Sequence, residues 1–206
     1  MIYLGINVSH GASAALMIEG KIVRAFQEER FNKIKNFVGY PKKSIEECIK
    51  FIKKKNLKID KAGFSTINNI AFPFKYPLDN YLNINDWLSY YLDDFFNKKS
   101  KIKQIKQKIK NKKKYKKIDL YLNYKKIKEK DYFSNYSIFR NLQKSYLEKQ
   151  AKGLINEISF IDHHTCHAHY SAFAPNIKDN KSAIITLDCE GDGLNQTFWI
   201  FDKKKN

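Results

Sequence analysis

The first 27 residues contain three short apolar segments separated by polar turns, and this pattern limits how the chain can begin to fold. The segments are residues 2–8 (IYLGINV), 12–18 (ASAALMI) and 21–27 (KIVRAFQ). Each has the length and composition of a strand. Glu19-Gly20 is typical of a tight hairpin turn, and Ser9-His10-Gly11 makes a polar turn whose side chains can bind a ligand. We predict that the chain begins as a three-stranded antiparallel sheet.

Helices and further strands follow, which predicts an α/β protein. Pro41 opens a helix over 41–55, whose apolar residues recur at spacings of three and four. A strand, a glycine-containing polar turn and a second strand occur near the start and again near residue 190, which suggests two lobes built on one plan. The other expected helices are residues 84–96 and 137–156, and the other expected strands are residues 62–67, 158–162, 182–188 and 196–202.

The composition excludes several classes of protein. The chain is 43% hydrophobic and 15% aromatic, so it can form a core and is not of disordered type. No apolar run approaches the roughly 20 residues of a membrane helix, and no signal peptide is recognisable. The three cysteines are scattered and odd in number. We therefore expect a reduced, cytoplasmic protein with no membrane partner.

The net charge of +18 belongs mainly to one segment. Residues 98–130 are dominated by lysine, with Asp119 and Glu129 as the acidic residues. This segment could bind RNA or anionic lipid, but it carries few aromatic residues and no known nucleic-acid-binding signature. Its thin stripe of isoleucines predicts a solvated helical insertion. A specific nucleic-acid partner is not expected.

The stretch FIDHHTCHAHYSAF, residues 160–173, holds four of the five histidines. If it is helical, His163 and His167 lie one turn apart on one face, where they can share a cation. Asp162 suits the N-cap, and the expected strand 182–188 ends in Asp188. Two imidazoles and a carboxylate suit Fe(II), Mn(II) or Zn(II). An ordinary helix with no metal remains the alternative, and the absence of the zincin glutamate argues against a metallopeptidase.

Residues 189–193, CEGDG, form a second candidate site. We expect a tight turn there, which could approach phosphate through its backbone amides or hold a divalent cation through Glu190 and Asp192. A solvated hairpin turn is the alternative.

Five blocks, taken in order, resemble the N-terminal domain of the carbamoyltransferases that modify nodulation factors, tobramycin and cephamycins. Cys189 and Asp192 depart from that family's pattern, in which glycine and glutamate are usual, and Lys33 replaces an arginine. The blocks are GINVSHGASAAL (5–16), EERFNKIK (28–35), YPKKSIEEC (40–48), HHTCHA (163–168) and LDCEGDG (187–193).

The resemblance implies a fold of the actin, sugar-kinase and heat-shock ATPase type, which is ribonuclease H-like. Residues 1–178 would form the first lobe, with a helical, lysine-rich insertion at about 72–156. Residues 179–206 would begin a truncated second lobe. Longer members carry the rest of that lobe and a separate domain that makes carbamoyl-adenylate from carbamoyl phosphate and ATP.

The resemblance also implies roles for individual residues. His163, His167 and Asp188 would bind a metal, for which the resemblance points to iron, with a fourth ligand from a later aspartate. His10 and His164 would serve catalysis, and His164 could instead support the metal ligands. Ser9, Gly11, Glu190 and Gly191 would bind the nucleotide cofactor.

The implied function is O-carbamoyl transfer from carbamoyl phosphate, through carbamoyl-adenylate, to a hydroxyl of a small molecule or sugar. The implied partners are the second lobe, the adenylate-forming domain and the hydroxyl acceptor. We expect the 206-residue chain alone to be inactive. A truncated, non-catalytic protein that binds a nucleotide, a protein partner or nucleic acid is the alternative.

Overall fold

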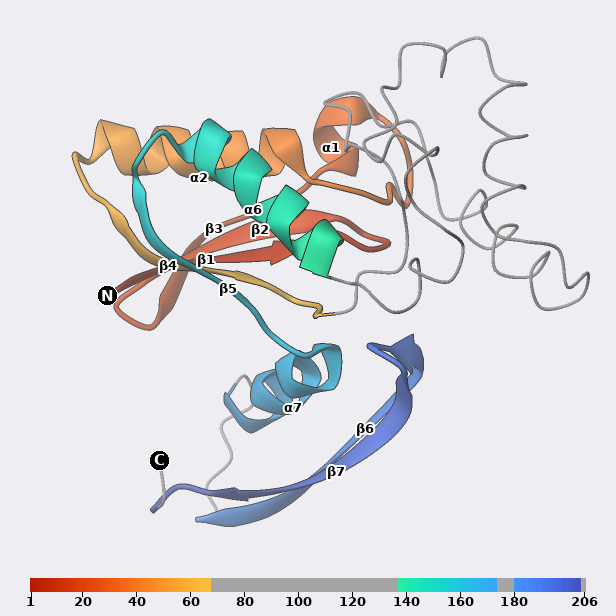
Figure 1. Cartoon of the computed structure of the whole chain (residues 1–206). Coiled ribbons are helices and arrows are strands. Elements are labelled where there is room, and N and C mark those ends of the chain that lie inside the picture. The colour runs from red at the N-terminus through yellow and green to blue at the C-terminus, as the bar shows by residue number, and fades with distance from the viewer. Residues whose placement is uncertain (68–136, 174–179, 205–206) are drawn as a thin grey trace, which may run out of the picture.

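The computed structural model describes residues 1–67, 137–173 and 180–204 (Figure 1). Two predictions lie outside these residues. One is the aromatic helix over 84–96, and the other is the lysine-rich helical insertion over 98–130.

A five-stranded mixed sheet forms the centre of the molecule, with strand order β3-β2-β1-β4-β5. The first three strands pair antiparallel, as predicted, with Leu4 opposite Leu16. β4 pairs parallel to β1 on one side and to β5 on the other. The strands are β1 (Ile2–Asn7), β2 (Ser13–Ile18), β3 (Lys21–Gln27), β4 (Ile59–Phe64) and β5 (Ile155–Phe160).

Two helices, α2 (Lys42–Lys54) and α6 (Ser137–Ala151), cover one face of this sheet (Figure 1). Alternate residues of each strand point into the layer between the sheet and these two helices, because the side-chain period of a strand is two. The short helix α1 (Glu29–Asn32) was not predicted. The core side chains from strands and helices include Leu4, Ile6, Leu16, Ile45, Ile49, Ile52, Ile59, Phe64 and Leu147.

The start of α2 is fixed by a buried carboxylate. Glu28 is only 4% exposed. Its side chain accepts hydrogen bonds from the backbone amides of Lys43 (3.1 Å) and Ser44 (2.8 Å) and from the Ser44 hydroxyl (2.9 Å). First-turn amides have no partner within a helix, so Glu28 supplies the cap that Pro41 cannot. The cap attaches α2 to the end of β3.

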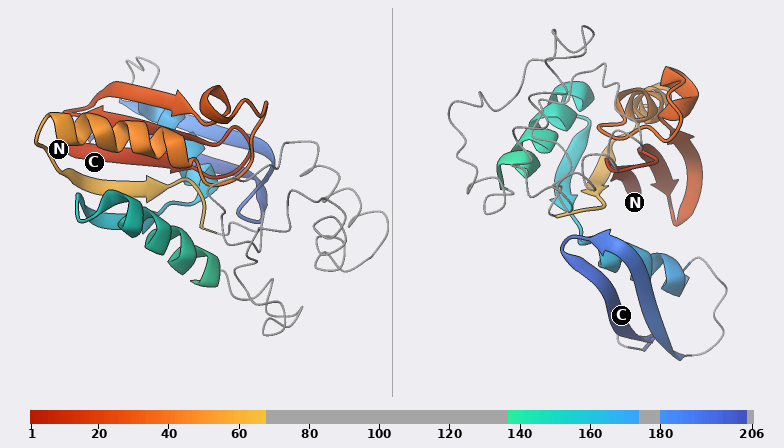
Figure 2. Two further views of the ribbon diagram at one scale, coloured as in Figure 1. Left: turned by 90° about the horizontal axis from the view of Figure 1, so that it is seen from above. Right: turned by 90° about the vertical axis from the view of Figure 1, so that its right-hand side faces the viewer.

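A second unit consists of α7 (His163–Phe173) and a hairpin of β6 (Lys181–Gly191) and β7 (Leu194–Asp202). It lies on the side of the large sheet opposite to α2 and α6 (Figure 2). The inner face of the hairpin packs on α7 through a small core of Ala168, Ala172 and Ile184, flanked by Trp199 and Phe201.

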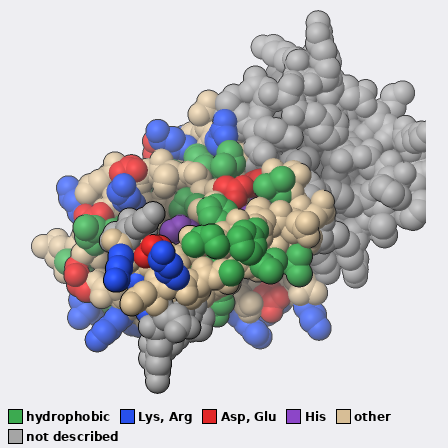
Figure 3. All heavy atoms as spheres, turned by 90° about the horizontal axis from the view of Figure 1, so that it is seen from below, with side chains coloured by type: hydrophobic (Ala, Val, Ile, Leu, Met, Phe, Trp, Pro, Cys, Tyr) green, Lys and Arg blue, Asp and Glu red, His purple; other side chains and the backbone are tan. Residues whose placement is uncertain are grey.

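The outer face of the hairpin is apolar and exposed. Ile185 and Ile200 are each about two-thirds exposed, as is Phe198, and Ile185 lies opposite Phe198 in the register. Figure 3 views the molecule from the hairpin side and shows hydrophobic side chains gathered there. This outer apolar face consists of Ile185, Leu187, Phe198 and Ile200.

Several predicted boundaries were wrong. The helix expected over 137–156 ends at Ala151, because Lys152 and Gly153 adopt left-handed φ values of 51° and 82° and β5 begins at Ile155. The strand expected at 62–67 is β4, which begins three residues earlier and ends at Phe64. The turn expected over 189–193 is only Asp192-Gly193, with φ values of 52° and 89°, and β6 continues through Gly191.

The described helices contain no segment that is both long enough and apolar enough to span a lipid bilayer.

Candidate metal centre

Three parallel strands end at the same edge of the large sheet, and the predicted site residues follow two of them. His10 lies in the turn after β1 and His163 directly follows β5, while Thr66 and Ile67 follow β4. Side chains that follow parallel strands meet at the carboxyl edge of a sheet, where α/β proteins bind ligands. The topology therefore brings distant parts of the sequence together at this edge.

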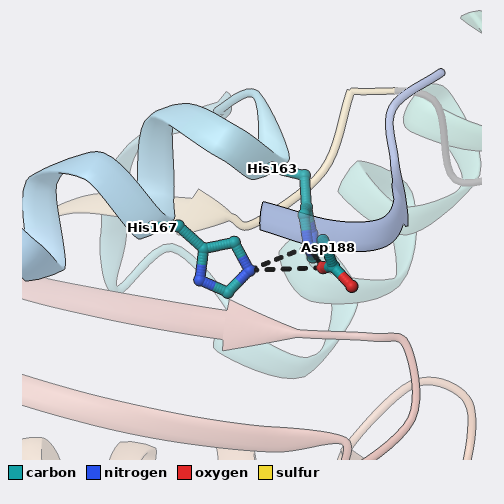
Figure 4. Close-up of side chains that lie close together, drawn as sticks. All are labelled: His163, His167 and Asp188. Atoms are coloured by element: carbon teal, nitrogen blue, oxygen red, sulfur yellow. Dashed lines mark hydrogen bonds and ion pairs between the residues drawn. The ribbon is translucent and has the colours of Figure 1, made fainter. Parts of the chain in front are cut away.

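The N-terminus of α7 presents the two predicted histidine ligands. The Asp162 carboxylate accepts hydrogen bonds from the Thr165 amide (2.8 Å) and hydroxyl (3.1 Å), which confirms it as the N-cap. His163 and His167 then lie one turn apart, and their Nε2 atoms are 3.0 Å from each other. Figure 4 shows both rings directed toward Asp188 on β6.

Asp188 reaches the histidines from an irregular part of the hairpin. Leu187 pairs with Gln196 and Gly191 pairs with Leu194, so residues 188–190 stand opposite Asn195 alone. Extra residues of this kind bend a strand and change the direction of its side chains. Asp188 lies on the same face of β6 as Ile184 and Thr186, which contact α7, because the side-chain period of a strand is two. The extra residues then set where Gly191 and Asp192 lie beside His163.

The three side chains form one compact donor set. Asp188 Oδ2 lies 2.7 Å from His163 Nε2 and 3.5 Å from His167 Nε2, and all the ligand atoms lie within 4.8 Å of one another. Metal–ligand bonds of about 2.0–2.2 Å place neighbouring ligand atoms at separations of this size. Because two imidazoles and one carboxylate suit a divalent transition metal, the residues fit the predicted ion.

His164 points away from the donor set and into the hairpin. Its side chain is fully buried. The Trp199 indole donates to Thr197 Oγ1 (2.5 Å), Thr197 Oγ1 lies 2.5 Å from Thr186 Oγ1, and Thr186 Oγ1 lies 2.6 Å from His164 Nδ1. His164 Nε2 lies 3.0 Å from the Leu194 carbonyl.

A carbonyl only accepts, so His164 Nε2 carries a proton and donates it to Leu194. In a neutral ring, Nδ1 then accepts from the Thr186 hydroxyl. Both ring nitrogens are engaged, so in this arrangement the ring joins α7 to the hairpin. Of the two roles expected for His164, support of its neighbour matches this placement.

Asp192 is a site residue whose main contacts were not predicted from the sequence. It was considered as a ligand for a cation or as part of a phosphate-binding turn. Its carboxylate instead accepts hydrogen bonds from the His163 amide (2.7 Å), the Ile67 amide (2.9 Å) and the Thr66 hydroxyl (2.6 Å). The available signal was Asp-Gly, a frequent two-residue turn, but nothing in the pattern indicated the partners Thr66 and Ile67, which follow β4.

Gly191 packs directly against His163. A Cβ atom built on Gly191 would lie 2.1 Å from His163 Cδ2, far closer than van der Waals contact allows. Gly191 was predicted to bind the nucleotide. The structure places it under a metal-ligand candidate, and only glycine leaves room for the imidazole ring there.

The first turn lies at the same edge as the donor set. Asn7 organises it, since its Oδ1 accepts from the Ser9 amide (3.1 Å) and hydroxyl (2.9 Å) and its side-chain nitrogen donates to the His10 carbonyl (3.1 Å). Gly11 has a φ of 65°, which glycine adopts readily. His10 is exposed and forms a backbone bridge with Val38. Ser9, His10 and Gly11 thus form a separate group, while Gly191 lies with the donor set.

Cys166 also lies on α7, between the two candidate histidine ligands in the sequence. Burial, with a smaller contribution from Asp162 and Asp192, raises the pKa of its thiol to about 11. The thiol is therefore protonated at neutral pH.

Residues 2–206 match the protein family described as Carbamoyltransferase N-terminus. No curated protein matches the chain. The family match covers nearly every residue, including both halves of the donor set and the turn after β1. The chain therefore belongs to the carbamoyltransferase N-terminal domain family.

Proposed function

We propose that the chain is the N-terminal part of an O-carbamoyltransferase that moves a carbamoyl group to a hydroxyl of a small molecule or sugar. The observation that carries the proposal is the convergence of His163, His167 and Asp188 at the N-terminus of α7, in a chain that belongs to this family. Carbamoyl phosphate and ATP would be the co-substrates.

The proposed fold is of the actin and heat-shock ATPase type. Strand order β3-β2-β1-β4-β5, with three antiparallel strands followed by two parallel ones, supports it. Residues 1–178 would form the first lobe, and residues from 179 would begin the second. The hairpin of β6 and β7, on the far side of the large sheet, would begin the second lobe, and α7, which packs on it, would belong to the first.

His163, His167 and Asp188 would hold the metal, which iron would suit. A divalent metal bound there would act as a Lewis acid toward a carbonyl or phosphoryl oxygen. The two histidines would be held by α7, and the carboxylate by the irregular part of β6. Because the three ligands come from two elements, the metal would also join those elements.

The turn after β1 would bind the other reacting groups. Ser9 and Gly11 lie in a turn fixed by Asn7, and Glu190 and Gly191 would approach the nucleotide from the hairpin. His10 is an exposed imidazole at the same edge. A neutral imidazole can take a proton from an acceptor hydroxyl, and we assign His10 that role or the binding of an anion. His164 would act by fixing the helix that carries His163.

Metal analysis tests the centre. Purified, untagged protein is loaded with Fe(II), Mn(II) or Zn(II), desalted, and its metal content is measured. We expect about one ion per chain in the wild type and a loss of at least tenfold in affinity in His163→Ala/His167→Ala, as for removal of ligands. His169→Ala is the matched control, since His169 is an exposed histidine of the same helix that stacks on Phe173. Equal metal content in the double variant and the wild type would overturn the assignment.

Carbamoyl transfer tests the reaction. The chain is assayed with radiolabelled carbamoyl phosphate, ATP and hydroxyl acceptors, alone and together with the second lobe and the adenylate-forming domain of a close relative. Transfer that depends on His163 and His167 supports the proposal. If the associated, metal-loaded pieces transfer nothing, the binding-protein alternative takes its place.

A further inference from the structure

We propose that Asp192 is the positioning residue of the metal centre: it fixes His163 and joins the centre to the end of β4. Three hydrogen-bond donors from two distant segments converge on its carboxylate. They are the His163 amide at 2.7 Å, the Ile67 amide at 2.9 Å and the Thr66 hydroxyl at 2.6 Å. The inference deepens the proposed function and rests on it only for the presence of a metal.

His163 is held at both ends by one hairpin. Asp188 contacts its ring at Nε2 (2.7 Å), Gly191 packs against the ring at Cδ2, and Asp192 accepts from its backbone amide. The ring and the backbone of this residue therefore cannot move independently of β6. A ligand held in this way keeps its direction before the metal arrives, which strengthens binding.

The partners of Asp192 call for a carboxylate. All three are donors, and an ionised carboxylate offers only acceptor sites on its two oxygens. Hydrogen bonds to a charged acceptor are also stronger than those between neutral groups. An asparagine would keep one oxygen but would turn an NH₂ group toward donors. The negative charge also lies at the N-terminus of α7, where the helix dipole favours it.

The link to β4 gives Asp192 a second consequence. Thr66 and Ile67 directly follow the strand next to β1, and Ser65 Oγ lies 3.5 Å from Asn7 Oδ1 in the first turn. Asp192 is therefore the carboxylate through which the hairpin contacts the carboxyl edge of the large sheet. Its loss should loosen the metal ligands and the end of β4 together.

The backbone of Asp192 permits clean substitutions. Its φ is 52°, a left-handed value that asparagine tolerates and glycine adopts without strain. Asp192→Asn therefore changes charge and one acceptor at constant shape, and Asp192→Gly removes the carboxylate without a steric conflict. Asp60→Asn is the matched control, because Asp60 also accepts a hydrogen bond from a backbone amide, that of Ile2 (2.7 Å), but lies near the start of β4, away from the Asp192 contacts.

The first measurement needs no metal. Backbone hydrogen exchange is followed by NMR in the 206-residue chain. The His163 amide opens a helix and has no acceptor within it, so its protection reports on Asp192. We expect exchange of the His163 and Ile67 amides to accelerate by about tenfold or more in Asp192→Gly. The amide of Ile161, which donates to the Phe64 carbonyl, should keep its protection.

The second measurement is Co²⁺ binding, followed by the visible absorption of the bound ion and by chelator competition. We expect affinity to fall by about 10- to 100-fold in Asp192→Gly, less in Asp192→Asn, and not in Asp60→Asn. If Asp192→Gly does not fold, Asp192→Asn carries both measurements. Unchanged amide protection, or Co²⁺ affinity equal to that of the control, overturns the inference. If the wild type binds no Co²⁺, the metal centre of the proposed function fails, and the amide exchange alone decides the role of Asp192.

Discussion

The two sides of the large sheet are held together in different ways. On one side, α2 and α6 bury a continuous layer of large apolar side chains. On the other, α7 and the hairpin share a core of two alanines and one isoleucine with two aromatic residues at its border. The second unit relies instead on polar contacts. They run from Trp199 through His164 to the Leu194 carbonyl, and from Asp192 to the segment that follows β4.

This difference separates stability from function. Apolar burial is non-directional and contributes most of the folding free energy. Hydrogen bonds contribute less on average but require a defined geometry. We infer that the α2–α6 side determines whether the chain folds, and that the α7–hairpin side determines whether three ligands meet. Each prediction below tests that division.

The largest effect is expected in the apolar layer. Phe64 is fully buried and stacks on Phe160 with ring centroids 4.9 Å apart. Phe64→Ala should destabilise the whole chain by about 3–5 kcal/mol, because it removes buried surface and leaves a cavity. Urea unfolding followed by circular dichroism measures this. A loss below about 1 kcal/mol, the range of a surface change, would show that the layer does not dominate stability.

Gly191→Ala should affect the site more than the fold. The new methyl group would collide with the ring of His163, so the ring must move and Co²⁺ affinity should fall by about 100-fold, or about 2.7 kcal/mol. Gly5→Ala is the control, because a Cβ there meets only the Ala15 carbonyl at an ordinary 3.9 Å. Tight Co²⁺ binding by Gly191→Ala would mean that the His163 ring is not fixed by β6.

Thr186→Val should loosen the second unit alone. The substitution keeps the shape of the side chain but removes the hydroxyl between Thr197 and His164. Leaving buried polar partners unsatisfied costs about 1–3 kcal/mol. Hydrogen exchange should accelerate in α7, β6 and β7 while the amides of β1 and β4 keep their protection. Equal acceleration in both regions would show that they unfold as one unit.

The smallest expected effect is a difference in the rate at which two thiols, one in each region, are modified. Cys48 is fully buried in the large core, and burial raises its pKa to about 12, whereas Cys166 has a pKa of about 11. Because both pKa values are raised above the usual value, both thiols are protonated at neutral pH and react only slowly. In dilute urea, local opening should let iodoacetamide modify Cys166 first, and peptide mass spectrometry resolves the two sites. Modification of Cys48 first, or of both at one rate, would contradict the division.

The same raised pKa values set a pH dependence. The folded state holds both thiol protons up to a higher pH than the unfolded state does. The resulting stabilisation is complete below pH 9, the usual thiol pKa, and is lost as the pH rises toward 11 and 12.

The apolar layer could be predicted from the sequence because its signals are local. The spacing of Ile45, Ile49 and Ile52 shows a helix with one buried face, and Glu19-Gly20 marks a hairpin turn. The predictions of an antiparallel start and of a helix at the position of α2 were accordingly confirmed. The capping of α2 by Glu28 was not predictable, because it joins residues that no periodic pattern connects.

The candidate site was predictable only in part. The one-turn spacing of His163 and His167 and the N-cap Asp162 are local features, and the structure confirms both as placed. The path of β6 past Asp188 was missed, because an irregular strand interrupts the alternation that sequence reasoning uses. The contacts of Asp192 and Gly191 depend on how the hairpin meets α7, which is tertiary information.

The outer apolar face of the hairpin also affects how the chain behaves at high concentration. Among the described residues, β6 and β7 pair only with each other, so each has an open edge. An open edge beside exposed aliphatic and aromatic side chains is a template for strand addition between molecules. Ile185, Phe198 and Ile200 are therefore the positions at which a threonine or lysine should improve solubility and crystallisation, since their side chains are exposed on the face of the hairpin opposite to Ile184, which packs on α7.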